Sequence, residues 1–310
     1  MVATTITIVG AGGVGCLLGA RLVRGGHDVR MLARGAALQV IRERGLLVRG
    51  PDGEHAAALA RASDDAAALG PSDLVVVTVK TWQLAELGPR LRPLIGDGTL
   101  VVPLQNGVEA SELLGGALGD AHVIGAVARM LCWVEQPGEV RWIGAAPSLT
   151  LGARQPAQAD AVEACAAALR LGGLEVLVTR AIERARWMKL LFIAPFGAVG
   201  AVERAPVGVV RAQPGARARL AAAMAEVAEV AAARGVALPA DAVQLTLARI
   251  DELPADGTSS MHRDLVDGRP SELHELLGAV VRLGREAGVA TPVSAELYAA
   301  LAPLEQAARA

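Results

Sequence analysis

The chain has 310 residues, which is long for one ordinary domain and suits two. Its hydrophobic fraction of 53% supports large cores, and its 20% of charged residues argues against wholesale disorder. The formal net charge is −2 with both signs interspersed, so we expect no nucleic acid and no anionic membrane among its partners.

The first part of the chain alternates short β-rich runs with helical patterns. We predict strands at 5–9, 29–33, 46–48, 73–79 and 100–104, a β-like segment at 123–151, helices at 14–24, 36–44 and 159–171, and a strand at 174–178. The apolar run at 73–79 is typical of a strand buried on both faces of a parallel sheet. This alternation indicates an α/β domain with a Rossmann-type, doubly wound parallel sheet over residues 1–179.

The pattern changes after about residue 179. The remaining segments are helical, with predicted helices at 181–202, 216–234, 240–250, 261–266 and 271–287 and no strand signal. We therefore predict an all-α second domain over residues 180–310 that binds substrate. Its apolar character also favours a homodimer.

No signal peptide is visible, and no apolar run is long enough to span a bilayer without interruption. The cysteines Cys16, Cys132 and Cys165 are widely spaced and form no CxxC pair. They are typical of core side chains in a reducing compartment, so we predict a cytoplasmic protein with no metal site.

A glycine loop follows the first predicted strand and opens the first predicted helix. Glycines in this setting allow a tight turn and a close approach of the backbone to a pyrophosphate at the helix N-terminus. We therefore predict a dinucleotide site at Gly10, Ala11, Gly12, Gly13, Val14 and Gly15.

The end of the second predicted strand distinguishes NADP from NAD. An NAD enzyme usually places Asp or Glu there to bind the ribose 2′-hydroxyl, whereas this chain has Arg34. A guanidinium suits a 2′-phosphate, so we predict NADPH as the cofactor. The alternative is a solvated surface arginine, since arginine is abundant in this chain.

Lysine and asparagine are scarce. Only two of the 30 basic residues are lysines, Lys80 and Lys189, and Asn106 is the single asparagine. A chain that uses arginine almost everywhere has reason to keep lysine where a compact ammonium is needed. Lys80 and Asn106 each follow a predicted parallel strand, at the edge where ligands bind in such sheets. Asn106 is also the first residue of an Asn-Gly turn dipeptide.

The second domain carries three further candidates. Lys189 lies on an apolar helix, where desolvation favours its use as a general acid, although a lysine can also snorkel from a helix edge. Ser260 and Glu272 follow in polar segments, and each also suits a helix start, Ser260 as a cap and Glu272 in a first turn after Pro270.

Taken together, these segments resemble the ketopantoate reductase (2-dehydropantoate 2-reductase) family over essentially the whole chain. The matching stretches are the glycine loop, 79–83, 105–107, 187–190, 258–261 with Asp264, and 268–269 with Glu272. The resemblance implies hydride transfer from NADPH to a 2-oxo acid. It also implies that Lys189 and Glu272 are the catalytic residues, with Lys189 donating the proton and Glu272 contacting the cofactor at its junction with the substrate. Ser260 would bind substrate, and Lys80 and Asn106 would bind the cofactor, Asn106 also touching substrate.

The predicted substrate pocket departs from the family pattern. Pantoate-forming members typically carry asparagine at three positions that are here Ile193, Gly197 and Val207. Ile193 and Gly197 share a helix face with Lys189, so we expect them to line the substrate site. Losing amide partners favours a more apolar 2-oxo acid or ketone as an alternative to 2-dehydropantoate.

Two other functions remain open from the sequence. One is a β-hydroxyacid dehydrogenase-like or imine-reducing enzyme, against which Glu272 and the Ser-Ser-Met segment at 259–261 argue. The other is a non-catalytic NADP-binding sensor, which would bind cofactor without turnover.

Overall fold

The computed structural model describes residues 3–309, and the chain divides into two compact units. The first unit comprises Met1–Gln105 and Glu109–Ile182, and the second comprises Asn106–Val108 and Glu183–Ala310. The sequence predicted one domain boundary, near residue 179. The contacts place this boundary after Ile182, and they also assign Asn106–Val108, which interrupt the sequence of the first unit, to the second unit.

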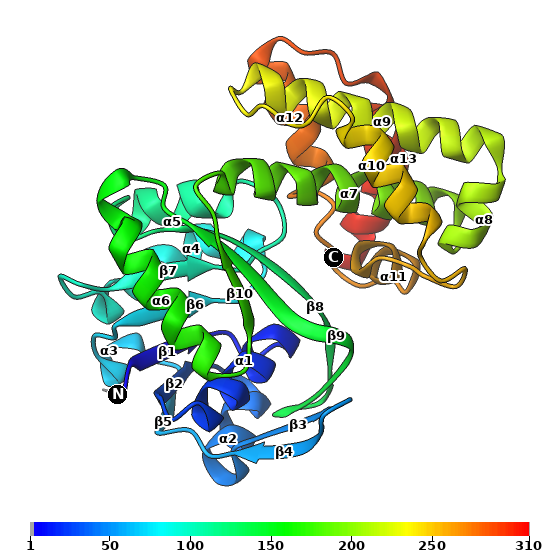
Figure 1. Cartoon of the computed structure of the whole chain (residues 1–310). Coiled ribbons are helices and arrows are strands. Elements are labelled where there is room, and N and C mark those ends of the chain that lie inside the picture. The colour runs from blue at the N-terminus through cyan, green and yellow to red at the C-terminus, as the bar shows by residue number, and fades with distance from the viewer. Residues whose placement is uncertain (1–2, 310) are drawn as a thin grey trace. The chain divides into compact units, whose positions relative to one another are not determined.

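The first unit is built on a five-stranded parallel sheet. Its strands are β1 (Thr5–Val9), β2 (Asp28–Leu32), β5 (Arg61–Ser63), β6 (Leu74–Val77) and β7 (Leu100–Pro103). They lie in the order β5-β2-β1-β6-β7, so the chain builds outward from β1 on one side and then crosses to β6 on the other (Figure 1). This is the doubly wound arrangement, and the prediction of a Rossmann-type parallel sheet is confirmed.

A second, mixed sheet completes this unit. Its strands are β3 (Leu46–Gly50), β4 (Gly53–Ala57), β8 (Gly125–Gln136), β9 (Glu139–Gly152) and β10 (Glu175–Val178). β8 and β9 form a long antiparallel hairpin, whereas β9 runs parallel to β3 and β10. The sequence indicated β structure in β3, β8, β9 and β10 but did not predict β4. It also did not predict a separate sheet, because the pairing of β3 with β9 joins residues far apart in the chain.

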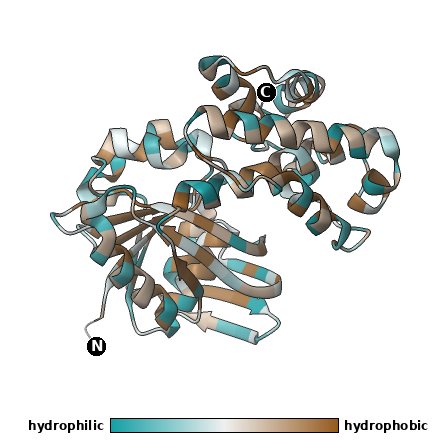
Figure 2. Cartoon of the chain, turned by 45° about the horizontal axis from the view of Figure 1, so that its top comes forward, coloured by the Kyte–Doolittle hydropathy of each residue, from teal (hydrophilic) through white to brown (hydrophobic). Residues whose placement is uncertain are grey.

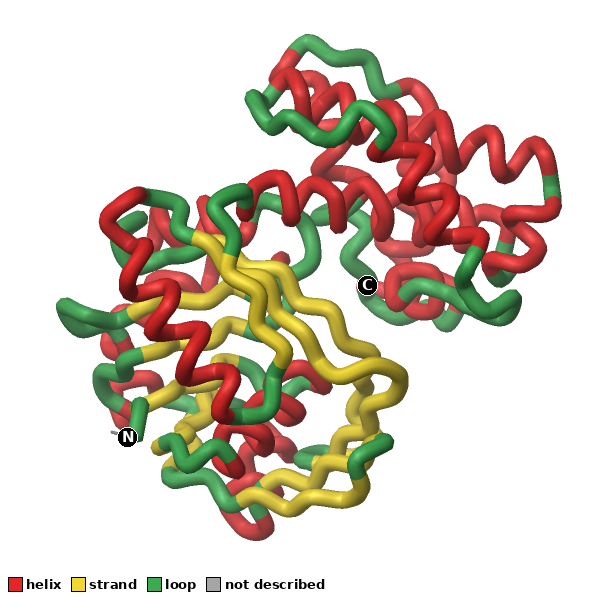
Figure 3. The backbone as a smooth tube through the Cα atoms, viewed as in Figure 1, coloured by secondary structure: helices red, strands yellow, loops and turns green. Residues whose placement is uncertain are grey.

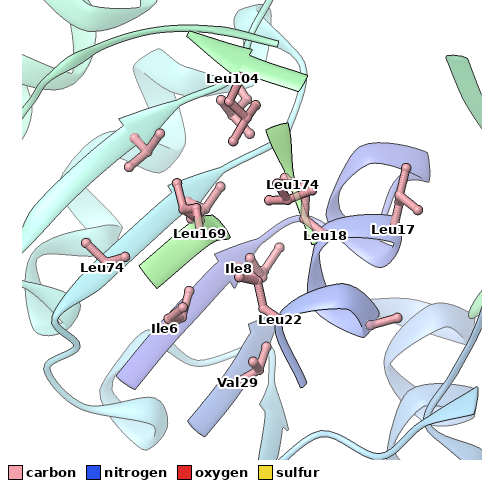
Figure 4. Close-up of a cluster of buried hydrophobic side chains, with 14 of the residues drawn as sticks. Ile6, Ile8, Leu17, Leu18, Leu22, Val29, Leu74, Leu104, Leu169 and Leu174 are labelled. Carbon is pink, nitrogen blue, oxygen red and sulfur yellow. The ribbon is translucent and has the colours of Figure 1, made fainter. Parts of the chain in front are cut away.

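Helix α1 (Gly13–Arg24) packs against strands of both sheets. Figure 4 shows Ile8 of β1 beside Leu18 and Leu22 of α1, all of which are fully buried. Burial of each such side chain contributes about 1.5–3 kcal/mol. Figure 2 shows the central strands coloured mainly as hydrophobic. The loop between β1 and α1 is therefore held by rigid elements on both sides.

The other helices of this unit connect its strands. They are α2 (Gly35–Arg44), α3 (Ala66–Leu69), η1 (Thr81–Gln83), α4 (Leu84–Leu87), η2 (Gly88–Leu94), α5 (Ala110–Leu118), η3 (Pro156–Gln158) and α6 (Ala159–Leu171).

Burial raises the pKa of the Cys16, Cys132 and Cys165 thiols to about 12, so all three remain protonated at neutral pH.

The regular structure of the second unit consists of helices alone within its described part, as predicted (Figure 3). Its helices are α7 (Ile182–Glu203), α8 (Val207–Ala212), α9 (Pro214–Ala233), α10 (Ala242–Asp251), α11 (Ser260–Val266), α12 (Leu277–Ala287) and α13 (Pro292–Arg309). Within residues 3–309, α7 alone has the length and hydropathy of a membrane-spanning helix. However, 67% of its apolar window is buried inside the protein, as in the core helix of a bundle.

Three features of this unit differ from the sequence prediction. Helices α8 and α13 were not predicted. Helix α12 begins at Leu277, so the prediction that Pro270 and Glu272 open a helix is wrong. Residues 271–276 instead form turns whose side-chain contacts go to α13.

Candidate cofactor and substrate sites

The glycine loop joins the carboxyl end of β1 to α1, and two of its glycines are required by the backbone. Gly10 has a φ of +108°, and a Cβ there would lie 2.9 Å from Val79 Cγ1. A Cβ on Gly15 would lie 2.0 Å from the carbonyl oxygen of Gly10. Gly12 differs from both, because nothing lies within 4 Å of its Cβ position. The loop is thus tightly packed inside and open on the side of Gly12.

The N-terminus of α1 has the character of an anion site. Its N-cap is Gly12, which forms no side-chain cap, and the first turn holds no acidic residue. Its first backbone N–H groups therefore form the positive end of the helix dipole without a competing carboxylate. These features fit the pyrophosphate of a dinucleotide.

Sequence reasoning missed Thr78, which stabilises this loop. Thr78 follows β6, and its hydroxyl donates to the carbonyl oxygens of Val9 (3.0 Å) and Gly10 (3.1 Å). The same oxygen would lie 2.6 Å from a Cβ on Gly15. Thr78 therefore holds the loop against the neighbouring strand at the point where the sheet order reverses, which is where open α/β sheets bind ligands.

Arg34 and Lys80 lie at the same edge of the sheet. Arg34 is the exposed N-cap of α2, directly after β2, and no ion pair to it occurs within residues 3–309. Lys80 follows β6, with its Nζ 5.6 Å from the centre of the Trp82 ring. Since β2 and β6 flank β1 in parallel register, the ends of all three strands are aligned.

The second unit brings Asn106 and Glu272 together. Asn106 Nδ2 donates to Glu272 Oε2 at 2.9 Å, and Glu272 is buried. Gly107 has a φ of +98°, and a Cβ there would lie 2.8 Å from the carbonyl oxygen of Glu275. The Asn-Gly dipeptide thus forms a turn and also places the Asn106 side chain against Glu272.

Helix α7 holds the 106–108 loop from its other side. The buried Arg186 donates to the carbonyl oxygen of Val108 and, through Nη1, to the two carboxylate oxygens of Glu183 at 2.8 and 2.9 Å. Lys189 lies one turn after Arg186 on the same helix. Sequence reasoning could not single out Arg186, because arginine is so common in this chain.

The two positions that follow Lys189 on the same face of α7 differ in the space around them. Ile193 is partly buried, whereas the Cβ direction of Gly197 is filled by α11. A Cβ on Gly197 would lie 2.7 Å from Met261 Cε and 2.8 Å from Ser259 Oγ. Residue 197 therefore sets how closely α11 approaches α7, rather than offering its own side-chain space to a ligand. Val207, the third departure from the family pattern, is buried in the core of this unit.

Ser260 is the exposed first residue of α11. The residue before it, Ser259, is the N-cap, and its hydroxyl accepts from the backbone N–H of His262 at 3.0 Å. The capping role that the sequence left open for Ser260 thus belongs to Ser259, and the hydroxyl of Ser260 is not needed for that cap.

The candidate residues therefore form two groups. The glycine loop, Arg34 and Lys80 share one sheet edge in the first unit. Asn106 and Glu272 are in direct contact in the second unit, while Lys189, Ile193, Gly197 and Ser260 lie on α7 and on the helix packed against it.

Comparison with known proteins shows which family this chain resembles. The family model described as ketopantoate reductase PanE/ApbA matches residues 6–156, and the model of the ketopantoate reductase PanE/ApbA C terminal matches residues 181–305. A 2-dehydropantoate 2-reductase of Mesorhizobium japonicum is 32% identical over 308 residues, covering 93% of each chain.

Two solved structures share the fold over nearly the whole length. A PanE/ApbA family ketopantoate reductase from Ralstonia eutropha JMP134 is 31% identical with a TM-score of 0.89, covering 99% of this chain and 100% of that one. A D-mandelate dehydrogenase solved with NADH and anilino(oxo)acetate is 23% identical with a TM-score of 0.88, covering 98% and 99%. With both family models matched and the same architecture, the chain belongs to the ketopantoate reductase family, oxidoreductases that act on a CH–OH/C=O group.

Proposed function

We propose that this chain is an NADPH-dependent 2-oxo acid reductase with 2-dehydropantoate as its first candidate substrate. The observation that carries the proposal is the hydrogen bond of 2.9 Å between Asn106 and Glu272. Asn106 lies on the 106–108 loop, which Arg186 binds to α7 one turn before Lys189. Burying the Glu272 carboxylate is costly unless hydrogen-bond donors such as Asn106 compensate for it, and a reductase needs donors and acceptors beside its proton donor.

The first unit would hold the cofactor. The space outside Gly12 and the uncapped N-terminus of α1 fit a pyrophosphate, and Arg34 fits a 2′-phosphate. Lys80 would bind the cofactor from the next strand. When bound, NADPH supplies the hydride. The mandelate dehydrogenase neighbour was solved with NADH, so the choice between the two cofactors rests on Arg34.

The second unit would supply the proton and the substrate contacts. Lys189 would donate a proton to the substrate carbonyl oxygen, and its positive charge would stabilise the alkoxide that develops. Asn106 and Glu272 would orient the reacting groups where cofactor and substrate meet. Ser260 would contact the substrate through its hydroxyl.

The substrate side chain is the open part of the proposal. Ile193 offers an apolar contact one turn after Lys189, and Gly197 offers no side chain. Neither can hydrogen-bond a hydroxyl group, which a pantoate precursor carries. A 2-oxo acid with an apolar side chain is therefore the alternative substrate.

The test is NADPH oxidation with 2-dehydropantoate, 2-oxoisovalerate, 4-methyl-2-oxopentanoate and phenylglyoxylate, each with wild type and Lys189→Met. We expect at least one acid to be reduced, and the variant to be slower by about 10²–10⁴-fold, the usual contribution of a general acid. If no acid is reduced faster by wild type than by the variant, the reductase proposal is wrong. Cofactor binding without any turnover would favour the sensor.

A further inference from the structure

The segment that carries Glu272 is held on one side by α13. Ser271 is fully buried, and its backbone N–H donates to both carboxylate oxygens of Glu305, at 3.2 and 3.0 Å. The Ser271 hydroxyl also donates to Glu305 and accepts from the backbone N–H of Leu273 at 3.2 Å. Ser271 therefore has its donors committed to one residue of α13.

A second residue of α13 secures the same position. Arg309, one turn after Glu305, donates to the carbonyl oxygen of Ser271 at 3.0 Å and to the Glu305 carboxylate. Three residues along, His274 Nδ1 lies 2.6 Å from the hydroxyl of Tyr298, which also belongs to α13. All the polar groups of Ser271 are thus bonded, and the segment is fixed at both 271 and 274.

Glu305 is itself fully buried, with no exposed surface. A buried carboxylate is destabilising unless donors surround it. Here the donors are the Ser271 backbone, the Ser271 hydroxyl and the Arg309 guanidinium. Glu305 and Ser271 therefore fix each other, since moving either leaves a charged or polar group without a partner.

Glu272 is the next residue in the chain, and its carboxylate accepts the hydrogen bond from Asn106. We propose that Glu305 and Arg309 are positioning residues that hold the Glu272 carboxylate against Asn106 by fixing the backbone of Ser271. This inference rests on the proposed role of Glu272 in the reaction. It assigns to α13 a function in the site although its residues do not touch Asn106 or Glu272 through any of these bonds.

The test is Glu305→Gln in two backgrounds, wild type and Glu272→Gln, assayed with NADPH and the fastest acid of the panel. Glutamine keeps the shape of Glu305 but replaces one acceptor oxygen with a donor that faces Ser271. We expect kcat/KM to fall about tenfold in the wild-type background and to change less than about twofold in the Glu272→Gln background, because residues of one network couple. Equal losses in both backgrounds would overturn the inference.

The matched control is Glu226→Gln. Glu226 is also a buried carboxylate that binds α13, accepting from the backbone N–H groups of Val293 (2.7 Å) and Ser294 (2.8 Å) at the other end of the helix. We expect it to lower Tm as Glu305→Gln does, while kcat/KM stays within about twofold. A similar loss of kcat/KM in both variants would show that α13 acts only through general stability.

Hydrogen exchange gives a readout that does not depend on turnover. We expect Glu305→Gln to speed exchange of the amides at 273–278, and Glu226→Gln to leave them protected.

Ser271→Ala provides a milder variant if Glu305→Gln does not fold. We expect it to lower kcat/KM and to speed amide exchange at 273–278 in the same way, but by a smaller factor. If Glu272→Gln retains full activity, the proposed role of Glu272 fails. If it loses activity while Glu305→Gln and Ser271→Ala lose none, only the role of α13 fails.

Discussion

We predict opposite effects on stability and on cofactor binding when Gly12 and Gly15 of the cofactor loop are each replaced by alanine. At Gly15 an added Cβ would lie 2.0 Å from the Gly10 carbonyl oxygen and 2.6 Å from Thr78 Oγ1. At Gly12 the Cβ would meet nothing within 4 Å, and the backbone there has an ordinary φ of −82°. Gly15→Ala should therefore damage the fold, whereas Gly12→Ala should damage only the binding of a ligand that approaches the loop.

The contact distances set the size of each effect. An ordinary Cβ contact begins at 3.4 Å, so the Gly10 oxygen must retreat by more than an ångström to admit a methyl group at position 15, and it is backbone held by Thr78. Overpacking of this kind costs about 3 kcal/mol, the upper part of its usual range. That corresponds to a fall in Tm of about 9 °C for a unit of this size. Gly12→Ala should change stability by less than about 1 kcal/mol.

The assay pairs thermal unfolding with NADPH titration by nicotinamide fluorescence. We expect Gly12→Ala to keep its Tm and to bind NADPH about tenfold more weakly, because its methyl group enters the space assigned to the pyrophosphate. Gly98→Ala, another glycine with nothing within 4 Å and outside the loop, is the control. The reasoning is refuted if Gly12→Ala binds NADPH as wild type does, or if Gly15→Ala melts at the wild-type temperature.

Three further predictions concern cofactor choice, pH and helix packing. Arg34→Ala should weaken NADPH binding about tenfold and leave NADH binding unchanged, whereas Arg44→Ala on the same helix should affect neither, as titration of both cofactors would show. Burial raises the pKa of Glu275, so the stability that its protonated form gives is complete at acid pH and lost as pH rises through that pKa. Glu275→Gln should thus raise the unfolding free energy by about 1 kcal/mol at about pH 8 and by nothing at about pH 4; a gain of the same size at both would contradict this. Gly197→Ala should lower stability by about 2 kcal/mol and raise KM more than it lowers kcat, since its methyl group meets the Ser259 hydroxyl that caps α11 and so disturbs the start of that helix at Ser260; an unchanged KM would contradict this effect on Ser260.

Much of the first unit could be predicted because its signals are local. The glycine loop, the apolar runs of β1 and β6 and the change of period after residue 179 each lie within a short window of sequence. Asn106 stood out for its rarity, and the structure gives it a hydrogen-bond partner 166 residues away. Its partner and its membership of the second unit could not be predicted, because both depend on contacts far along the chain.

The errors in the second unit have physical causes as well. Pro270 and Glu272 suit a helix start, but Glu305 and Arg309 bind the backbone groups of Ser271 and hold 271–276 as turns. Tertiary contacts thus decide the local structure of 271–276. Helix α13 contains Pro303, which has no backbone N–H to donate within a helix and so weakens its helical signal in the sequence.

The excursion of residues 106–108 into the second unit has a consequence for biosynthesis. Val108 belongs to the hydrophobic core of that unit, and its carbonyl oxygen is bound by Arg186, which is made 78 residues later. Asn106 is bound by Glu272, whose neighbour Ser271 is in turn held by Glu305, made 34 residues later. Until those later residues have been made, the 106–108 loop lacks its partners. Contacts of such long sequence separation form slowly, so we expect this loop to be among the last parts of the first unit's sequence to become ordered.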